Sequence, residues 1–159
     1  MDIHEKFMKK ALGRANTAAK HGETPVGCVI VKDGRVVAGG RNSREYGKNA
    51  LYHAEISAIN AACKKLGGWR LHECDLYVTL EPCPMCAGAI INSRIKNVYF
   101  GAYDKKAGSF GSIVNLAELP YNHKPEIFGG ILEKECSDVL SEFFRELRLN
   151  KKKSKAVEE

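Results

Sequence analysis

The stretch Pro82-Cys83-Pro84-Met85-Cys86 places two cysteines three positions apart beside two prolines. Pro84 suits the first position of a helix, because its missing N–H would have no partner there. We therefore expect Cys83 to cap a helix and Cys86 to lie in its first turn, with both sulfur atoms on one face. Unpaired N–H groups and the positive end of the helix dipole at that terminus favour thiolate, the form that binds metal.

Two cysteines do not complete a metal site, and a third ligand is available upstream in His53-Ala54-Glu55. Catalytic zinc usually takes three protein ligands and keeps a fourth position open. His53, Cys83 and Cys86 supply three, so the sequence predicts one zinc ion per chain. His53 and Glu55 can serve one site only if a helix begins at this point, since residues two apart in mid-helix point in nearly opposite directions.

Glu55 distinguishes a catalytic metal from a structural one. A structural zinc site would be closed by a fourth Cys or His, and His72 and Cys74 are the candidates that the sequence leaves open. With an open position, zinc can activate a water molecule, and Glu55 can accept its proton and return it to the substrate. This arrangement suits hydrolytic deamination.

The 159 residues fit one domain with a single core, which we place at residues 1–150. Of the net charge of +6, residues 143–155 carry +5, because six basic residues there face Glu146 alone. We expect residues 151–159 to form a basic, disordered tail, and an anionic partner would suit this charge. The sequence has no apolar run long enough for a membrane span and no secretory signal, which favours a cytoplasmic protein with reduced cysteines.

Hydrophobic periodicity predicts four helices. The first covers residues 3–21, the second begins near His53, the third follows Cys83, and the last contains an apolar stripe. We expect the second helix to bury Ile56, Ile59, Cys63 and Leu66 and to end at Gly67-Gly68. The stripe of the last helix consists of Cys136, Val139, Leu140, Phe143, Phe144 and Leu147.

Strands are expected at 25–31, 35–40, 75–80, 97–102 and 126–130, with a hairpin turn at Asp33-Gly34 and an irregular loop at 41–52. Alternation of strands and helices predicts an α/β fold: a three-layer α/β/α sandwich with a mixed, largely parallel central sheet of about five strands. Cys83 then lies at the C-terminal end of a strand, where open α/β sheets place their ligand sites.

His-x-Glu followed by Pro-Cys-x-x-Cys is the signature of zinc-dependent nucleobase deaminases. Over about residues 8–148 the chain resembles the tRNA-specific adenosine deaminases of the bacterial TadA type, within the cytidine deaminase-like superfamily. The residues and segments that carry this resemblance are 25–27, 42, 53–55, 76–83, 86–89, 100–102, 104, 108, 122–123 and 143–145. One departure is Tyr52, which stands where the family usually has alanine and would affect the wall beside the metal.

The resemblance implies a homodimer that converts the wobble adenosine of a tRNA anticodon stem-loop to inosine. It implies that Asn42 hydrogen-bonds the flipped nucleotide and that Asp104 contacts a neighbouring ribose. The other residues that it assigns to substrate binding are Pro25, Val26, Ala54, Pro82, Asn122, Phe144 and Arg145. The residues themselves allow other interpretations: Asn42 as a turn residue, Asp104 as a loop cap and Phe144 as core.

Two other functions fit parts of the sequence. A deaminase of the same fold that acts on free guanine or cytosine, or on a nucleoside, would share the zinc site but would have no use for a basic C-terminal helix. A non-catalytic zinc module that binds RNA would tolerate the loss of Glu55.

Overall fold

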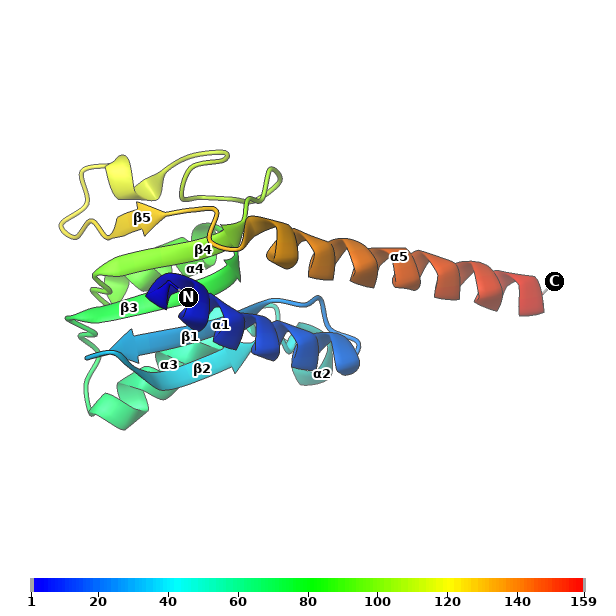
Figure 1. Cartoon of the computed structure of the whole chain (residues 1–159), viewed down its shortest axis with the longest axis horizontal. Coiled ribbons are helices and arrows are strands. Elements are labelled where there is room, and N and C mark those ends of the chain that lie inside the picture. Colours follow the sequence, from blue (N-terminus) through cyan, green and yellow to red (C-terminus); the bar gives the residue numbers. More distant parts are fainter. Residues whose placement is uncertain (1, 159) are drawn as a thin grey trace.

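The sheet of the computed structural model, which describes residues 2–158, has the strand order β2-β1-β3-β4-β5 (Figure 1). The strands are β1 (Gly27–Lys32), β2 (Arg35–Arg41), β3 (Cys74–Leu80), β4 (Asn97–Ala102) and β5 (Glu126–Phe128). β1 is antiparallel to both β2 and β3, whereas the pairs β3–β4 and β4–β5 are parallel. Four strands therefore run in one direction and β1 opposes them, which confirms the mixed, largely parallel sheet.

The hairpin between β1 and β2 turns at Asp33 and Gly34, as the sequence predicts. Both residues have positive φ, 52° and 73°, which is the requirement of a type I′ turn. Since this turn matches the natural twist of paired strands, it sets the register of the antiparallel edge of the sheet.

Helices cover both faces of the sheet and complete the predicted three layers (Figure 1). α1 (Ile3–Lys20) and the first turns of α5 (Glu133–Glu158) pack on one face, and α3 (Ala54–Leu66) and α4 (Pro84–Asn92) pack on the other. The sequence did not predict two short elements, α2 (Arg44–Gly47) within the 41–52 loop and the 3₁₀ helix η1 (Leu116–Glu118). Among residues 2–158, no helix is long and apolar enough to cross a membrane.

The predicted buried stripe of α3 is wrong. Its buried residues are Ala54, Glu55, Ala58 and Ala62, while Ile56, Ile59 and Cys63 are half-buried and Leu66 is exposed. The reason is the close approach of α3 to β2: a Cβ on Gly40 would lie only 2.7 Å from the backbone nitrogen of Ala58. Small residues on the contact line permit this approach, and the larger side chains are displaced to its flanks.

α5 also departs from the prediction. Cys136 is buried and Phe143 is half-buried, but Phe144 and Leu147 are exposed because the helix leaves the body of the protein and projects into solvent (Figure 1). Residues 151–158, expected to be disordered, continue this helix to Glu158. Their lysines, alanine and glutamate are good helix formers, and no Gly or Pro interrupts them. Residue 159 lies outside the described residues.

Candidate functional site

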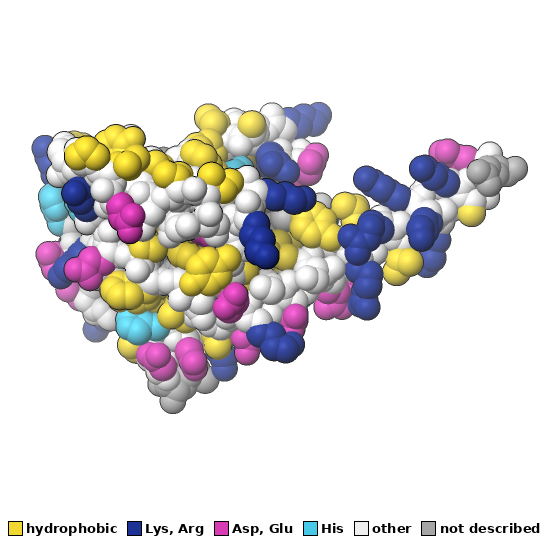
Figure 2. Space-filling view, turned by 90° about the horizontal axis from the view of Figure 1, so that it is seen from above, with side chains coloured by type: hydrophobic (Ala, Val, Ile, Leu, Met, Phe, Trp, Pro, Cys, Tyr) yellow, Lys and Arg dark blue, Asp and Glu magenta, His cyan; other side chains and the backbone are white. Residues whose placement is uncertain are grey.

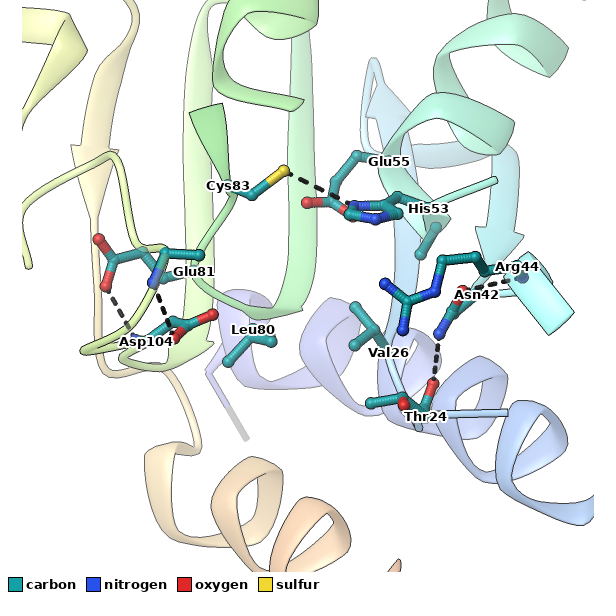
Figure 3. Close-up of a pocket in the computed structure, with 12 residues that line it drawn as sticks. Thr24, Val26, Asn42, Arg44, His53, Glu55, Leu80, Glu81, Cys83 and Asp104 are labelled. Carbon is teal, nitrogen blue, oxygen red and sulfur yellow. Dashed lines mark hydrogen bonds between the residues drawn. The ribbon is translucent and has the colours of Figure 1, made fainter. Parts of the chain in front are cut away.

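Two helix N-termini meet at one edge of the sheet and supply the site. His53 is the N-cap of α3, with extended backbone angles, and Cys83 is the N-cap of α4, with Pro84 as its first helical residue. The predicted cap at Cys83 is confirmed, and so is the start of a helix at His53. Because His53 stands outside the helix and Glu55 inside it, their side chains converge despite being two positions apart, and Figure 3 shows both directed toward Cys83.

The ligand atoms of His53, Cys83 and Cys86 all lie within 4.8 Å of one another. Each sulfur atom is 3.6 Å from Nδ1 of His53. Tetrahedral zinc, with Zn–S of about 2.3 Å and Zn–N of about 2.0–2.1 Å, places a sulfur and a nitrogen ligand about 3.5 Å apart. The spacing and the donor set therefore fit zinc.

The two possible fourth ligands do not reach this cluster. Cys74 begins β3, whereas Cys83 follows the opposite end of that strand. His72 is exposed and lines a separate surface hollow with Lys96 and His123. Within residues 2–158 the metal-ligand cluster contains only the three predicted residues, so its fourth position is free for water or substrate.

The environment of the cluster shifts the pKa values of four titratable groups, upward for His53, Glu55 and Cys86 and downward for Cys83. A hydrogen bond with Cys86 lowers the pKa of the Cys83 thiol to about 4, and the same bond raises the pKa of the Cys86 thiol, so the two sulfur atoms share one proton at neutral pH and Cys83 is the thiolate. Burial raises the pKa of the Glu55 carboxyl to about 7, and only 4% of this residue is exposed. A carboxyl with a pKa near the ambient pH can both take up and release a proton.

A cavity of about 230 Å³ opens beside the cluster. This volume lies just below the range of about 300–1,000 Å³ that is usual for small-molecule pockets, and suits a single base. Seven predicted site residues line it, from five segments of the chain: Val26, Asn42, His53, Ala54, Glu55, Cys83 and Asp104. Figure 3 shows Val26 and Asn42 on one side and Asp104 on the other.

Several residues that the resemblance assigns to the substrate lie outside this cavity. Pro25 and Pro82 are buried directly before Val26 and Cys83 and are not part of the lining. Asn122 is exposed between η1 and β5, and Phe144 and Arg145 are exposed on α5, so Phe144 is not core. The ring of Tyr52 lies against Gly47 of α2 and is 40% exposed, and it is not part of the lining.

Comparison with known proteins agrees with the geometry. Residues 1–102 match the family model of the cytidine and deoxycytidylate deaminase zinc-binding region. The chain is 49% identical over 153 residues to the tRNA-specific adenosine deaminase of Bacillus subtilis, covering 96% of this chain and 95% of the relative. The chain belongs to the tRNA-specific adenosine deaminase family. Zinc is the cofactor of this family of deaminases, one ion per chain.

Two solved structures place this deaminase among its neighbours. One, from a study of A-to-I editing by tRNA:A34 deaminases at the wobble position of transfer RNA, has a TM-score of 0.82 and 43% identity, over 85% of this chain and 99% of that chain. The other is a guanine deaminase from Bacillus subtilis, with a TM-score of 0.63 and 37% identity over 80% of this chain and 84% of that chain.

Glu81 is a pocket residue to which sequence reasoning assigned no role. Its carboxylate is 2% exposed and accepts hydrogen bonds from the backbone N–H groups of Asp104, Phe110 and Ser112 at 3.0–3.2 Å and from the Ser112 hydroxyl. A Cβ on Gly108 would collide with this carboxylate. Glu81 thus holds together the loop 104–112, which brings Asp104 and Ala107 to the cavity.

Glu23 holds the opposite rim of the cavity in place, as Glu81 holds the loop 104–112. It is 1% exposed, and its two carboxylate oxygens accept hydrogen bonds of 2.9 Å from the backbone N–H groups of Glu45 and Tyr46. This fastens α2, from which Arg44 lines the cavity. The segment 41–52 contains Arg44 and both residues that Glu23 binds. Because this segment has no periodic pattern, neither Glu23 nor Arg44 could be identified from sequence.

We expect Glu81→Gln to loosen the loop 104–112. The change replaces one acceptor oxygen by an NH₂ group that faces N–H donors, and a buried donor left without a partner costs about 1–3 kcal/mol. Amide hydrogen exchange should accelerate at Phe110 and Ser112, and KM should rise more than kcat falls, since Glu55 and the zinc ligands are untouched. The control is Glu126→Gln, at an exposed position on β5, and equal exchange in both variants would contradict the role of Glu81.

Proposed function

We propose that this deaminase hydrolyses the exocyclic amino group of the wobble adenosine in a tRNA anticodon loop, yielding inosine and ammonia. The observation that carries the proposal is the buried carboxyl of Glu55 beside the His53, Cys83 and Cys86 cluster, at a cavity sized for one base. The relatives named for tRNA adenosine deamination supply the substrate class. A tRNA substrate and six free cysteines support a cytoplasmic location.

His53, Cys83 and Cys86 hold the zinc ion in this proposal. When bound, zinc supplies Lewis-acid activation of a water molecule at its open position. Glu55 takes a proton from the attacking water and delivers it to the ring nitrogen next to the amino-bearing carbon. It then transfers the second proton to the amino nitrogen, so that ammonia leaves and a carbonyl remains. The enclosed position of Glu55 keeps bulk water away from these transfers.

Polar groups at the rim of the cavity retain hydrogen-bond donors and acceptors that are free to bind a nucleotide. Asn42 donates one Nδ2 hydrogen to Thr24 O and accepts at Oδ1 from the Arg44 N–H. It retains one donor and one lone pair for the substrate. Oδ1 of Asp104 accepts from Lys106 and Ala107 N–H groups, which leaves Oδ2 to accept from a ribose hydroxyl. The turn and cap interpretations of these residues are therefore compatible with substrate contact.

An anticodon loop suits this site because its bases are unstacked and reach a pocket at low cost. The test is to incubate the zinc-loaded protein with an anticodon stem-loop and, separately, with guanine, cytosine and free adenosine. We expect inosine in the stem-loop and ammonia released in equal amount. Conversion of guanine or cytosine with no inosine in RNA would assign the protein to the free-base branch, to which its guanine deaminase neighbour belongs.

The projecting part of α5 supplies a surface for RNA. Arg145, Arg148 and the lysines at 151, 152, 153 and 155 are all exposed, and Figure 2 shows basic side chains along this helix. Phe144, 41% exposed, offers a ring on which a splayed base can stack. Exposed Asn122 is a further contact in this proposal.

Removal of this surface should weaken RNA binding without harming the chemistry. We expect deletion of residues 150–159 to reduce the slope of log affinity against log salt by about 0.7 for each lost phosphate contact. Phe144→Ala and Arg145→Ala should raise KM for the stem-loop while leaving the melting temperature nearly unchanged, because both side chains are exposed. Unchanged KM and slope in all three variants would rule out this surface.

The same helix also supports a homodimer. Leu147 and Leu149 are 40% and 51% exposed on a segment that projects from the body, and an isolated helix of this length gains little stability without packing. A second copy of the chain that covers these side chains would supply this packing. Light scattering of the zinc-loaded protein at micromolar concentration should give twice the monomer mass of 17.6 kDa, whereas a monomer alone would refute the dimer.

A further inference from the structure

A basic groove lies between α1 and the end of the edge strand β2, on the opposite face of the sheet from α3. Its lining consists of Lys10, Gly13, Arg14, Thr17 and Arg41. The four residues of α1 recur at spacings of three and four, so they form one face of the helix. Three of these five residues are cationic and none is acidic.

The sequence of β2 makes room for one of these cations. A Cβ on Gly39 would lie 2.6–2.7 Å from three atoms of the Arg14 guanidinium, Nε, Cζ and Nη2. The guanidinium therefore lies directly over the bare backbone of the strand. Residues two apart on a strand share a face, so Arg41 emerges beside Gly39 and shares the groove with Arg14.

Among residues 2–158, no acidic side chain forms an ion pair with the cations of this groove. Nη1 of Arg41 is buried and has no hydrogen-bond partner. Across the described residues, the ion pairs join Lys96 to Glu73, Lys134 to Asp138 and Arg145 to Glu142, and so involve none of the three groove cations. Like charges that line one groove repel each other, and a buried donor without an acceptor is costly. An anion bound between them would relieve both costs.

We propose that Lys10, Arg14 and Arg41 bind a phosphate group. Phosphate suits the site because guanidiniums present paired N–H donors that match its oxygens, and Lys10 adds a point charge. The position favours a backbone phosphate of the RNA as the source: Arg41 ends β2, and the next residue, Asn42, lines the catalytic cavity. RNA that enters this cavity over Arg44 can pass around the edge of β2, which no further strand covers.

The preference for a backbone phosphate rests on the proposed function, whereas the phosphate site itself does not. The experiment therefore has two arms, both with the zinc-loaded protein. One measures the salt dependence of affinity for an anticodon stem-loop that already contains inosine, so that no turnover occurs. The other measures binding of inorganic phosphate by calorimetry. Formation of inosine by the unmodified protein, tested separately, decides the proposed function.

Two variants probe the groove by different means. Arg14→Gln with Arg41→Gln removes charge, and Gly39→Ala keeps the charge but displaces the Arg14 guanidinium. Lys20→Gln is the control, because it removes an exposed cation from the last turn of the same helix outside the groove. Thermal melting verifies that each variant folds. If Gly39→Ala does not fold, the double variant alone still tests the groove.

A backbone-phosphate site predicts that the salt slope falls by about 0.7 per lost contact in both groove variants and stays unchanged in Lys20→Gln. An unchanged RNA slope together with loss of inorganic-phosphate binding in the groove variants would support the phosphate site with a free anion as its ligand. If the groove variants match the control in both arms, the proposal is overturned.

Discussion

Glu55→Gln is expected to bind zinc and RNA normally and to turn over at least about 10²–10⁴-fold more slowly, the usual cost of losing general acid–base catalysis. The amide keeps the shape of the side chain in a position that is 4% exposed, so the cavity should persist. An amide cannot accept a proton from water at neutral pH, however, and both transfers in the reaction pass through this carboxyl. Single-turnover formation of inosine in a stem-loop measures the loss directly.

A matched control separates this effect from a general loss of acidic charge. Glu118→Gln removes an exposed carboxylate of η1 and should keep full activity. Zinc content and stem-loop affinity should be equal in the two variants. Undiminished turnover in Glu55→Gln would remove its catalytic role. Absence of turnover in the unmodified protein, with stem-loop binding retained in both variants, would favour the non-catalytic RNA-binding alternative.

The residues at the metal could be predicted because their chemistry is local. Pro84 identifies the start of α4, and the requirement that His53 and Glu55 share a site identifies the start of α3. The hairpin at Asp33-Gly34 is equally local, since positive φ at both residues follows from the turn type. Each of these inferences depends on a few neighbouring positions, and each agrees with the structure.

The features that the sequence did not reveal depend on distant parts of the chain. The bulky residues of α3 were expected to be buried, but Gly40 on β2 draws the helix so close that only its alanines fit between. The apolar stripe of α5 continues past the point at which the body of the protein ends, and the sequence does not mark that point. Glu81 was likewise hidden, because its four donors come from a loop more than twenty residues away.

Cys83→Ala should lose the zinc ion and with it part of the stability of the fold. Because ligands and metal assemble only in the folded chain, metal-binding energy is also folding energy. A ligand at a hundredfold excess over its Kd contributes about 2.7 kcal/mol. At roughly 2–4 °C per kcal/mol for a domain of this size, Tm should fall by about 5–11 °C. Removal of zinc from the unmodified protein with a chelator should produce a similar shift.

Cys63→Ala is the matched control for this variant, because Cys63 is a free, half-buried cysteine of α3 outside the cluster. Elemental analysis should find one zinc per chain in the control and little in Cys83→Ala. A chelator should lower the Tm of the control but not that of Cys83→Ala, since the latter has no metal to lose. Full zinc occupancy in Cys83→Ala would contradict the assignment of this ligand, whereas loss of zinc with an unchanged Tm would mean that the metal serves chemistry alone.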